Sequence, residues 1–135
     1  MKASVLVVED DSANRDALRR VLERAGFEVV LADNGRTALA EVGQQPFAAV
    51  VCDLKMPALS GMGVYAVLRE LFPALAARMV FVTAFADDPK IREFLRGTGQ
   101  PALEKPFKIA DLVEVVRRIA AQPDGAATDP RPRTG

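Results

Sequence analysis

Residues 4–11 read SVLVVEDD, in which a run of apolar residues leads directly into three consecutive acids. The apolar part has the length and the valine content of a buried parallel strand. Neighbouring carboxylates repel one another, and the end of a buried segment is a costly place to put them. Two explanations fit these residues: a solvated strand end, or carboxylates that converge on a cation.

Apolar runs of strand length recur along the chain after Val5–Val8. They lie at Phe27–Ala32, Phe47–Val51 and Met79–Val82, with a weaker run at Pro101–Leu103. Continuous runs of this kind favour parallel strands that are covered on both faces. The sequence therefore predicts a parallel sheet of five strands.

Helical patterns separate these runs. The first begins after Ser12, which we interpret as the N-cap, and ends at Gly26. The strict alternation of strand and helix predicts right-handed crossovers and a doubly wound, three-layer α/β fold, (βα)5. The remaining helical patterns lie at Thr37–Val42, Val64–Leu71 before Pro73, Ile91–Leu95 closed by Gly97, and Ile109–Val116.

The composition limits the classes of function. Of the 135 residues, 18 are basic and 18 acidic, so charge gives no reason to expect nucleic acid or a membrane surface as a partner. Histidine is absent, which excludes Ser-His-Asp and Cys-His nucleophile pairs. The single cysteine, Cys52, excludes an internal disulfide, and we interpret it as a small buried apolar residue.

Both ends of the chain carry further information. The first apolar run is too short for a signal peptide or a membrane span, so we expect a cytoplasmic protein. Residues 122–135 are rich in proline and glycine and poor in large apolar side chains. We therefore expect one domain over residues 1–121, followed by a disordered tail or linker over residues 122–135.

Reactive side chains stand at the ends of the later strands as well. Asp53 ends the third apolar run, Thr83 ends the fourth, and Lys105 follows the fifth. Sites in doubly wound sheets lie outside the carboxyl ends of the strands. We expect these three residues to gather with the first acids at one edge of the sheet.

Four stretches in this order carry a family resemblance: VVEDD (7–11), VVCDLKMPALSG (50–61), FVTA (81–84) and ALEKPF (102–107). Together they resemble the receiver domain of two-component response regulators, and the resemblance covers about residues 3–121. It implies a flavodoxin-like sheet with strand order 2-1-3-4-5. It also implies a phosphoacceptor in a phosphorelay that catalyses its own phosphorylation and dephosphorylation without being a multiple-turnover enzyme on an external substrate.

The resemblance assigns a metal site to the acids. Asp53 is the implied phosphoryl acceptor, and Asp10 and Asp11 are implied to hold one Mg²⁺ together with Asp53 and the backbone carbonyl of Lys55. These oxygen ligands suit a small, hard cation. We assign no metal bond to Glu9.

Other residues take their implied roles from the same resemblance. Lys105 contacts the phosphoryl group as a positive charge, and the Thr83 hydroxyl turns toward it. The Lys105–Pro106 peptide is expected to be cis. Gly61 is expected to allow close backbone packing after the acceptor strand.

The implied partners are a histidine kinase or a histidine phosphotransfer protein, because a chain without histidine cannot supply its own phosphohistidine. A downstream protein is expected on the face of the fourth helix, fifth strand and fifth helix. Ala102 stands where receivers that switch an output usually have Tyr or Phe, and alanine has no rotamer to swing. We therefore hypothesise a receiver that passes phosphate along or sequesters it, as receivers at the C-terminal end of hybrid histidine kinases often do.

Three other functions compete with this one. A pseudo-receiver, which binds partners without being phosphorylated, would usually lack an acid, the acceptor or the lysine, and none is missing here. A phosphatase of the haloacid dehalogenase type needs a second Asp two residues after the first, where this chain has Lys55. Direct nucleic-acid binding lacks a basic patch.

Overall fold

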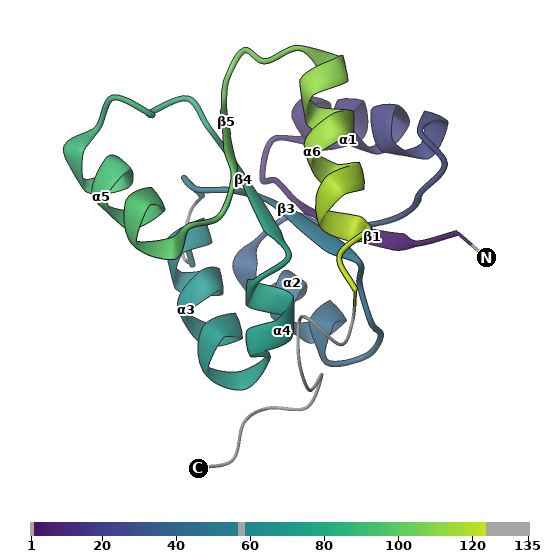
Figure 1. Cartoon of the computed structure of the whole chain (residues 1–135), viewed down its shortest axis with the longest axis horizontal. Helices are drawn as coiled ribbons and strands as arrows, with labels where there is room; N and C mark the ends of the chain where they lie inside the picture. The colour runs from purple at the N-terminus through teal and green to yellow at the C-terminus, as the bar shows by residue number, and fades with distance from the viewer. Residues whose placement is uncertain (1, 57–58, 124–135) are drawn as a thin grey trace.

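A five-stranded parallel sheet forms the centre of the molecule in the computed structural model, which describes residues 2–56 and 59–123 (Figure 1). The strand order is β2-β1-β3-β4-β5, which confirms the predicted 2-1-3-4-5 arrangement. All four strand pairs are parallel. The strands are β1 Ser4–Val8, β2 Glu28–Ala32, β3 Ala49–Asp53, β4 Met79–Thr83 and β5 Ala102–Glu104.

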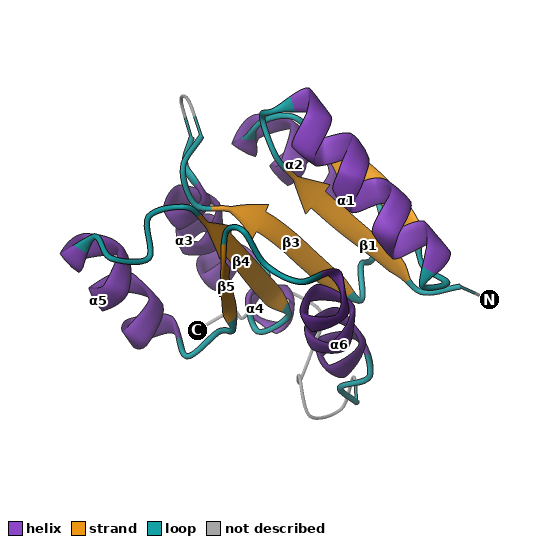
Figure 2. Ribbon diagram, turned by 90° about the horizontal axis from the view of Figure 1, so that it is seen from above, coloured by secondary structure: helices purple, strands orange, loops and turns teal. Residues whose placement is uncertain are grey.

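Helices cover both faces of this sheet and complete the three layers (Figure 2). Two helices, α1 Ser12–Arg24 and α6 Ile109–Ala120, pack on one face. Four pack on the other: α2 Gly35–Val42, α3 Gly61–Leu71, the single turn α4 Pro73–Ala76, and α5 Pro89–Thr98. None of these helices is long and apolar enough to cross a membrane.

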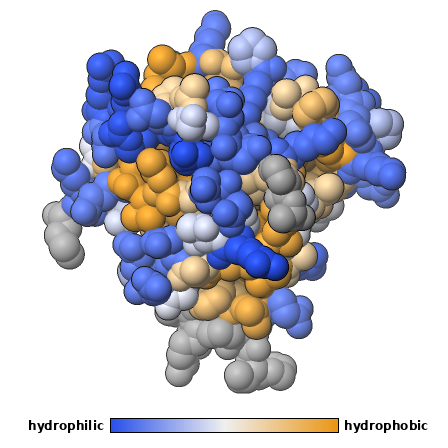
Figure 3. Space-filling view, turned by 180° about the vertical axis from the view of Figure 1, so that it is seen from behind, coloured by the Kyte–Doolittle hydropathy of each residue, from blue (hydrophilic) through white to orange (hydrophobic). Residues whose placement is uncertain are grey.

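Alternate residues of β1, β2, β3 and β4 supply two separate cores. In β1, Val5 and Val7 pack toward α1 and α6, whereas Leu6 and Val8 pack toward the other layer. Every residue of β3 and of β4 is buried, as expected for central strands that are covered on both faces. The face of the molecule shown in Figure 3 mixes hydrophilic side chains with smaller hydrophobic areas.

Helix ends account for most of the differences from the sequence prediction. The N-cap of α1 is Asp11 rather than Ser12, because the Asp11 carboxylate accepts the backbone N–H of Asn14. Gly97 lies inside α5, which continues to Thr98, and Gly99 in the left-handed conformation ends it. The short α4 was not predicted; Pro73 begins it at a position where a helix needs no N–H.

The strand register brings the reactive residues to one edge. Val8 pairs with Cys52, so Glu9 follows β1 at the level where β3 ends in Asp53. Asp53 pairs with Val82, and the next residue, Thr83, is the last of β4. The carboxyl ends of β1, β3, β4 and β5 therefore share one edge of the sheet, where doubly wound folds place their sites.

Candidate functional site

Asp53 lies at the centre of this edge as the last residue of β3, and only 6% of it is exposed. Each of its carboxylate oxygens has a partner. Oδ1 accepts the backbone N–H of Lys55 at 3.0 Å, and Oδ2 accepts from Nζ of Lys105 at 2.8 Å. The carboxylate is thus fixed between a backbone donor and a cation.

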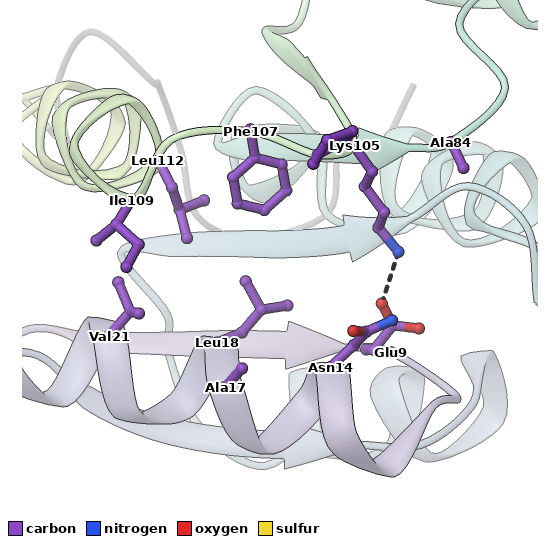
Figure 4. A pocket seen from close by; sticks show the side chains of 11 residues that line it. Glu9, Asn14, Ala17, Leu18, Val21, Ala84, Lys105, Phe107, Ile109 and Leu112 are labelled. Atoms are coloured by element: carbon purple, nitrogen blue, oxygen red, sulfur yellow. Dashed lines mark hydrogen bonds and ion pairs between the residues drawn. The ribbon is translucent and has the colours of Figure 1, made fainter.

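Lys105 reaches this carboxylate from the chain just beyond β5. Its backbone N–H donates to the Thr83 carbonyl at 2.8 Å, and the Lys105–Pro106 peptide is cis, as predicted. Nζ also lies 2.9 Å from Oε1 of Glu9, so Lys105 joins the end of β5 to the end of β1 (Figure 4). Burial lowers the pKa of Lys105, but its hydrogen bonds to Asp53 and Glu9 outweigh that effect and leave the pKa raised.

Three acids converge on one point. One carboxylate oxygen from each of Glu9, Asp10 and Asp53 lies within 4.8 Å of the others. Glu9 is 1% exposed, and its pKa rises to about 7 because burial and the charge of Asp53 outweigh its hydrogen bond to Lys105. A cluster of carboxylate oxygens is the donor set that Mg²⁺ prefers, so these residues fit a divalent cation.

The structure distributes the three N-terminal acids differently from the sequence prediction. Asp11 lies outside this cluster: its side chain is exposed and caps α1 through the N–H of Asn14, 2.8 Å away. Glu9, to which no metal bond had been assigned, lies inside it. Strand alternation would have placed Glu9 on the same face as Asp53, because Glu9 continues the series of Val5 and Val7 and Asp53 continues that of Val51.

Arg15, on the first turn of α1, holds the acidic segment and was missed in the sequence. Its Nη1 donates to the carbonyl of Glu9 at 3.0 Å and to that of Asp10 at 3.3 Å. The backbone of both acids is thereby tied to α1. Contacts from a side chain to carbonyls five and six residues away leave no pattern in a single sequence, which is why Arg15 was not singled out.

Thr83 and Cys52 lie where the sequence places them. Thr83 is 1% exposed at the end of β4, and its hydroxyl oxygen accepts the backbone N–H of Phe85 at 2.9 Å. Cys52 is fully buried in the core on the other face from Val51, and burial raises the pKa of its thiol far above the usual range. A thiol in this state behaves as an apolar core residue.

Gly61 shapes the segment that follows Asp53. A Cβ at this position would run into the carbonyl oxygen of Asp53 and would lie 2.9 Å from Cα of Leu54. The Gly61 N–H also donates to the Leu54 carbonyl at 3.1 Å, so the start of α3 is pressed against the end of β3. The close packing predicted for this glycine is confirmed.

A groove runs away from the acids between α1 and the chain that leads into α6 (Figure 4). It has a volume of about 550 Å³. Glu9 and Lys105 stand at its polar end, and apolar side chains line the rest, among them Leu18, Val21 and Phe107. The site is therefore flanked by an apolar depression on the α1 side.

The family follows from comparison with known proteins. A model of the response regulator receiver domain matches residues 5–117. The chain belongs to this family. It is a receiver domain of two-component signal transduction, and receiver domains are signalling domains that interact with histidine kinases or phosphotransfer proteins.

Curated relatives include both long and short proteins. The chain is 33% identical over 120 residues to the response regulator FleR of Pseudomonas aeruginosa, covering 89% of this chain but 25% of FleR. It is 30% identical over 115 residues to the receiver protein CpdR of Brucella abortus, covering 85% of this chain and 94% of CpdR. The chain thus spans about a quarter of FleR and nearly all of CpdR.

Solved receiver structures share the fold. A CheY-like receiver protein from Methanospirillum hungatei superposes with a TM-score of 0.81 at 26% identity, covering 89% of this chain and 94% of that one. The receiver domain of sensor histidine kinase PA1611 from Pseudomonas aeruginosa gives 0.78 at 26% identity, covering 90% and 100%. That structure contains a magnesium ion coordinated in its active-site cleft.

Proposed function

We propose that Asp53 accepts a phosphoryl group from a phosphohistidine on a histidine kinase or phosphotransfer protein. The observation that carries this assignment is the placement of the Asp53 carboxylate between Lys105 and the acids Glu9 and Asp10. A carboxylate nucleophile needs nearby positive charge to neutralise the phosphoryl oxygens, and this site offers a lysine and a place for a metal ion.

The proposed transfer is a displacement at phosphorus. A carboxylate oxygen of Asp53 forms the new bond to phosphorus, while the bond from phosphorus to the donor's imidazole nitrogen breaks and that nitrogen keeps the electron pair. Lys105, 2.8 Å from Oδ2 before transfer, remains beside the phosphoryl oxygens as a compact cation. The Thr83 hydroxyl, now bonded to the N–H of Phe85, becomes a donor to one of those oxygens.

We assign the metal to the converging acids. Asp10 and Asp53 would hold Mg²⁺, with Glu9 beside them and the Lys55 carbonyl as a further oxygen. When bound, the ion would neutralise charge on the transferred group. The part of Asp11 in metal binding stays a prediction, which its position as the cap of α1 does not support.

Four further expectations stand beside this proposal. Ala102 is exposed on β5. The hypothesis of a receiver that passes phosphate along rests on its residue type, because alanine has no side-chain rotamers and cannot act as a switch. A downstream partner on the face of α5, β5 and α6 and a cytoplasmic location stay predictions. The domain boundary at residue 121 does too, and most of the tail expected after it lies outside the described residues.

Mass spectrometry after incubation with acetyl phosphate and Mg²⁺ tests the function. The wild type is expected to gain one phosphoryl group, and Asp53→Asn none. Asp87→Asn is the matched control, because Asp87 is a highly exposed carboxylate away from the cluster. A wild type that gains no phosphate would favour the pseudo-receiver, and a phosphorylated Asp53→Asn would place the acceptor elsewhere.

A further inference from the structure

Leu59, in the segment between β3 and α3, lies in a glycine socket formed by Gly35 and Gly63. A Cβ added to Gly35, the first residue of α2, would lie 2.8 Å from both Cβ and the carbonyl oxygen of Leu59. A Cβ added to Gly63, in the first turn of α3, would run into Cδ1 of Leu59. Real Cβ atoms do not approach other heavy atoms that closely, so only glycine at these two positions leaves room for the leucine.

Space for Leu59 is the reason that the structure gives for a glycine at position 63. Glycine is unfavourable within a helix, because it loses more backbone freedom on folding than any other residue. The backbone of Gly63 is not left-handed, so any L-amino acid could adopt its conformation. Leu59 itself is partly buried and packs against the core on the α2 side of the sheet. The contact thus fixes the segment that carries Leu59 against α2 and α3.

This segment is tied to the proposed phosphoryl acceptor at both of its ends. At its start, the Lys55 N–H donates to Oδ1 of Asp53 at 3.0 Å. At its end, the Gly61 N–H donates to the Leu54 carbonyl at 3.1 Å, directly after Asp53. Leu59 lies between these two bonds and holds the segment against the two helices. The direction of the Lys55 backbone groups therefore depends on an anchor outside the acidic cluster.

We propose that Leu59 is a positioning residue for the acceptor. Seated in the glycine socket, it holds the chain after Asp53 so that the Lys55 N–H orients the carboxylate and the Lys55 carbonyl stays available to the metal ion. This inference rests on the proposed roles of Asp53 and Lys55. Leu59 acts through the backbone and not by contact with the phosphoryl group. One wall of the socket belongs to α2, from which no residue is assigned to the site, so α2 also influences the geometry of the acceptor.

NMR relaxation of the full chain without metal tests how firmly the Lys55 backbone is held in the folded state. The wild type is expected to show an order parameter of about 0.85 at the Lys55 amide, as rigid backbone does. Leu59→Ala is expected to lower this value to below about 0.7, while Val51 in β3 keeps its wild-type value, because only the segment loses its anchor. Leu59→Met, which keeps the length of the side chain, is expected to restore it. An unchanged Lys55 amide in Leu59→Ala would overturn the proposal, even if that variant were less stable.

The affinity for Mg²⁺ measures the consequence for the site. Leu59→Ala is expected to weaken Mg²⁺ binding by about three- to ten-fold, because groups that orient metal ligands contribute to affinity without touching the ion. Leu59→Met is expected to bind within about two-fold of the wild type. Leu71→Ala is the matched control, since it truncates a leucine at the end of α3 that is 47% exposed, and it is expected to bind as the wild type does. Wild-type affinity in Leu59→Ala would contradict the positioning role.

Gly63→Ala tests the glycine socket from its other side. In the wild type the added methyl group would displace Leu59, so this variant is expected to lower the urea midpoint of unfolding and to weaken Mg²⁺ binding. In the Leu59→Ala background the clashing atoms are gone and alanine is the better helix former, so the same substitution is expected to raise the midpoint. An effect of the same sign and size in both backgrounds would show that the contact has no influence, against the proposal.

The outcomes separate this inference from the proposed function. If the wild type gains no phosphoryl group from acetyl phosphate and binds no Mg²⁺, the acceptor role of Asp53 fails and the inference fails with it. If the wild type is phosphorylated at Asp53 and Leu59→Ala matches it in rate, in Mg²⁺ affinity and in the order of the Lys55 amide, the inference is wrong and the proposed function stands. Slower phosphorylation of Leu59→Ala that Leu59→Met restores would support both.

Discussion

Nζ of Lys105 lies 2.8 Å from Oδ2 of Asp53, although 52 residues separate them in the chain. The same ammonium group lies 2.9 Å from Glu9, so one cation serves two buried carboxylates from different strands. Removing either carboxylate leaves the cation one partner, whereas removing the cation leaves two acids facing each other. Lys105 is therefore the residue on which the electrostatic balance of the site depends.

Lys105→Met is expected to destabilise the protein at neutral pH and to slow phosphorylation. Leaving two buried acids without their cation costs about 1–3 kcal/mol of unfolding free energy, a cost that falls in acid as Glu9 becomes protonated. Urea unfolding with chelator and phosphorylation by acetyl phosphate measure the two effects. Lys108→Met, an exposed lysine with no capping bond, is the control and should change neither. Full stability of Lys105→Met at neutral pH would contradict this account.

Glu9 is expected to make the metal-free protein less stable as the pH rises. Its pKa is raised from 4.5 to about 7, so between these values the folded state binds more protons than the unfolded state. The unfolding free energy contributed by Glu9 therefore falls as the pH increases through this range. Urea unfolding of the wild type and of Glu9→Gln between about pH 5 and about pH 7.5 measures this. The Gln variant should lose the downward slope; an unchanged slope would rule Glu9 out as its source.

Two neighbouring acids are expected to give different phenotypes. Asp10→Asn should weaken Mg²⁺ binding by about ten-fold or more, because it removes a charged ligand from the cluster. Asp11→Ala should instead cost about 1 kcal/mol of unfolding free energy through loss of the α1 cap. Asp11→Asn, which can still cap the helix, should restore stability. Calorimetric titration measures the affinity of each variant for Mg²⁺. If Asp11→Asn weakened Mg²⁺ binding as much as Asp10→Asn does, Asp11 would be a metal ligand after all.

Most of the fold could be predicted because burial on both faces leaves a plain signal. The valine-rich runs of β1, β3 and β4 give the strands, and alternation with helices gives parallel connections. The end of a strand is harder to locate: the weak fifth apolar run ends at Leu103, whereas β5 ends at Glu104. Apolar periodicity stops where polar residues of the site begin, so it cannot show how far the backbone pairing continues.

The assignment of the acids shows a different limit. The letters EDD at residues 9–11 state that three carboxylates are present, but capping a helix and facing a cation use the same chemical group. Backbone direction decides between them, since Glu9 continues the series of β1 side chains that faces α1 and α6, whereas Asp11 directly precedes the first turn of α1. The motifs therefore predict where the site lies, and the roles of the individual acids follow only from the structure.

Gly61→Ala is expected to destabilise the protein by about 1–3 kcal/mol, because the added methyl group would press on the backbone of Asp53 and Leu54. The displaced carboxylate should also lower the phosphorylation rate. Gly43→Ala is the matched control: its Cβ would meet atoms no closer than 3.6 Å, and its backbone is right-handed helical. Urea unfolding of the two variants compares them, and equal stability would refute the close packing at Gly61.

Ala102→Tyr is expected to leave the rate of phosphorylation within about two-fold of wild type. Ala102 is exposed on β5 and opposite Phe81 in the strand register, so the new side chain touches none of the acids. A time course with acetyl phosphate and Mg²⁺ gives the rate. A large change in acceptor chemistry would argue that position 102 influences Asp53 directly, against the hypothesis of a receiver that lacks an aromatic switch.

The parallel sheet gives the site a property that no single residue could. Glu9, Asp53, Thr83 and Lys105 come from the ends of four different strands, and the Glu9–Lys105 bond alone joins residues 96 positions apart. These groups lie together only where the four strands share one edge of the sheet. Under the proposed function, phosphorylation therefore requires that the chain has been synthesised through β5 and that the sheet has formed. A chain that is shorter or not yet folded is expected to accept no phosphoryl group.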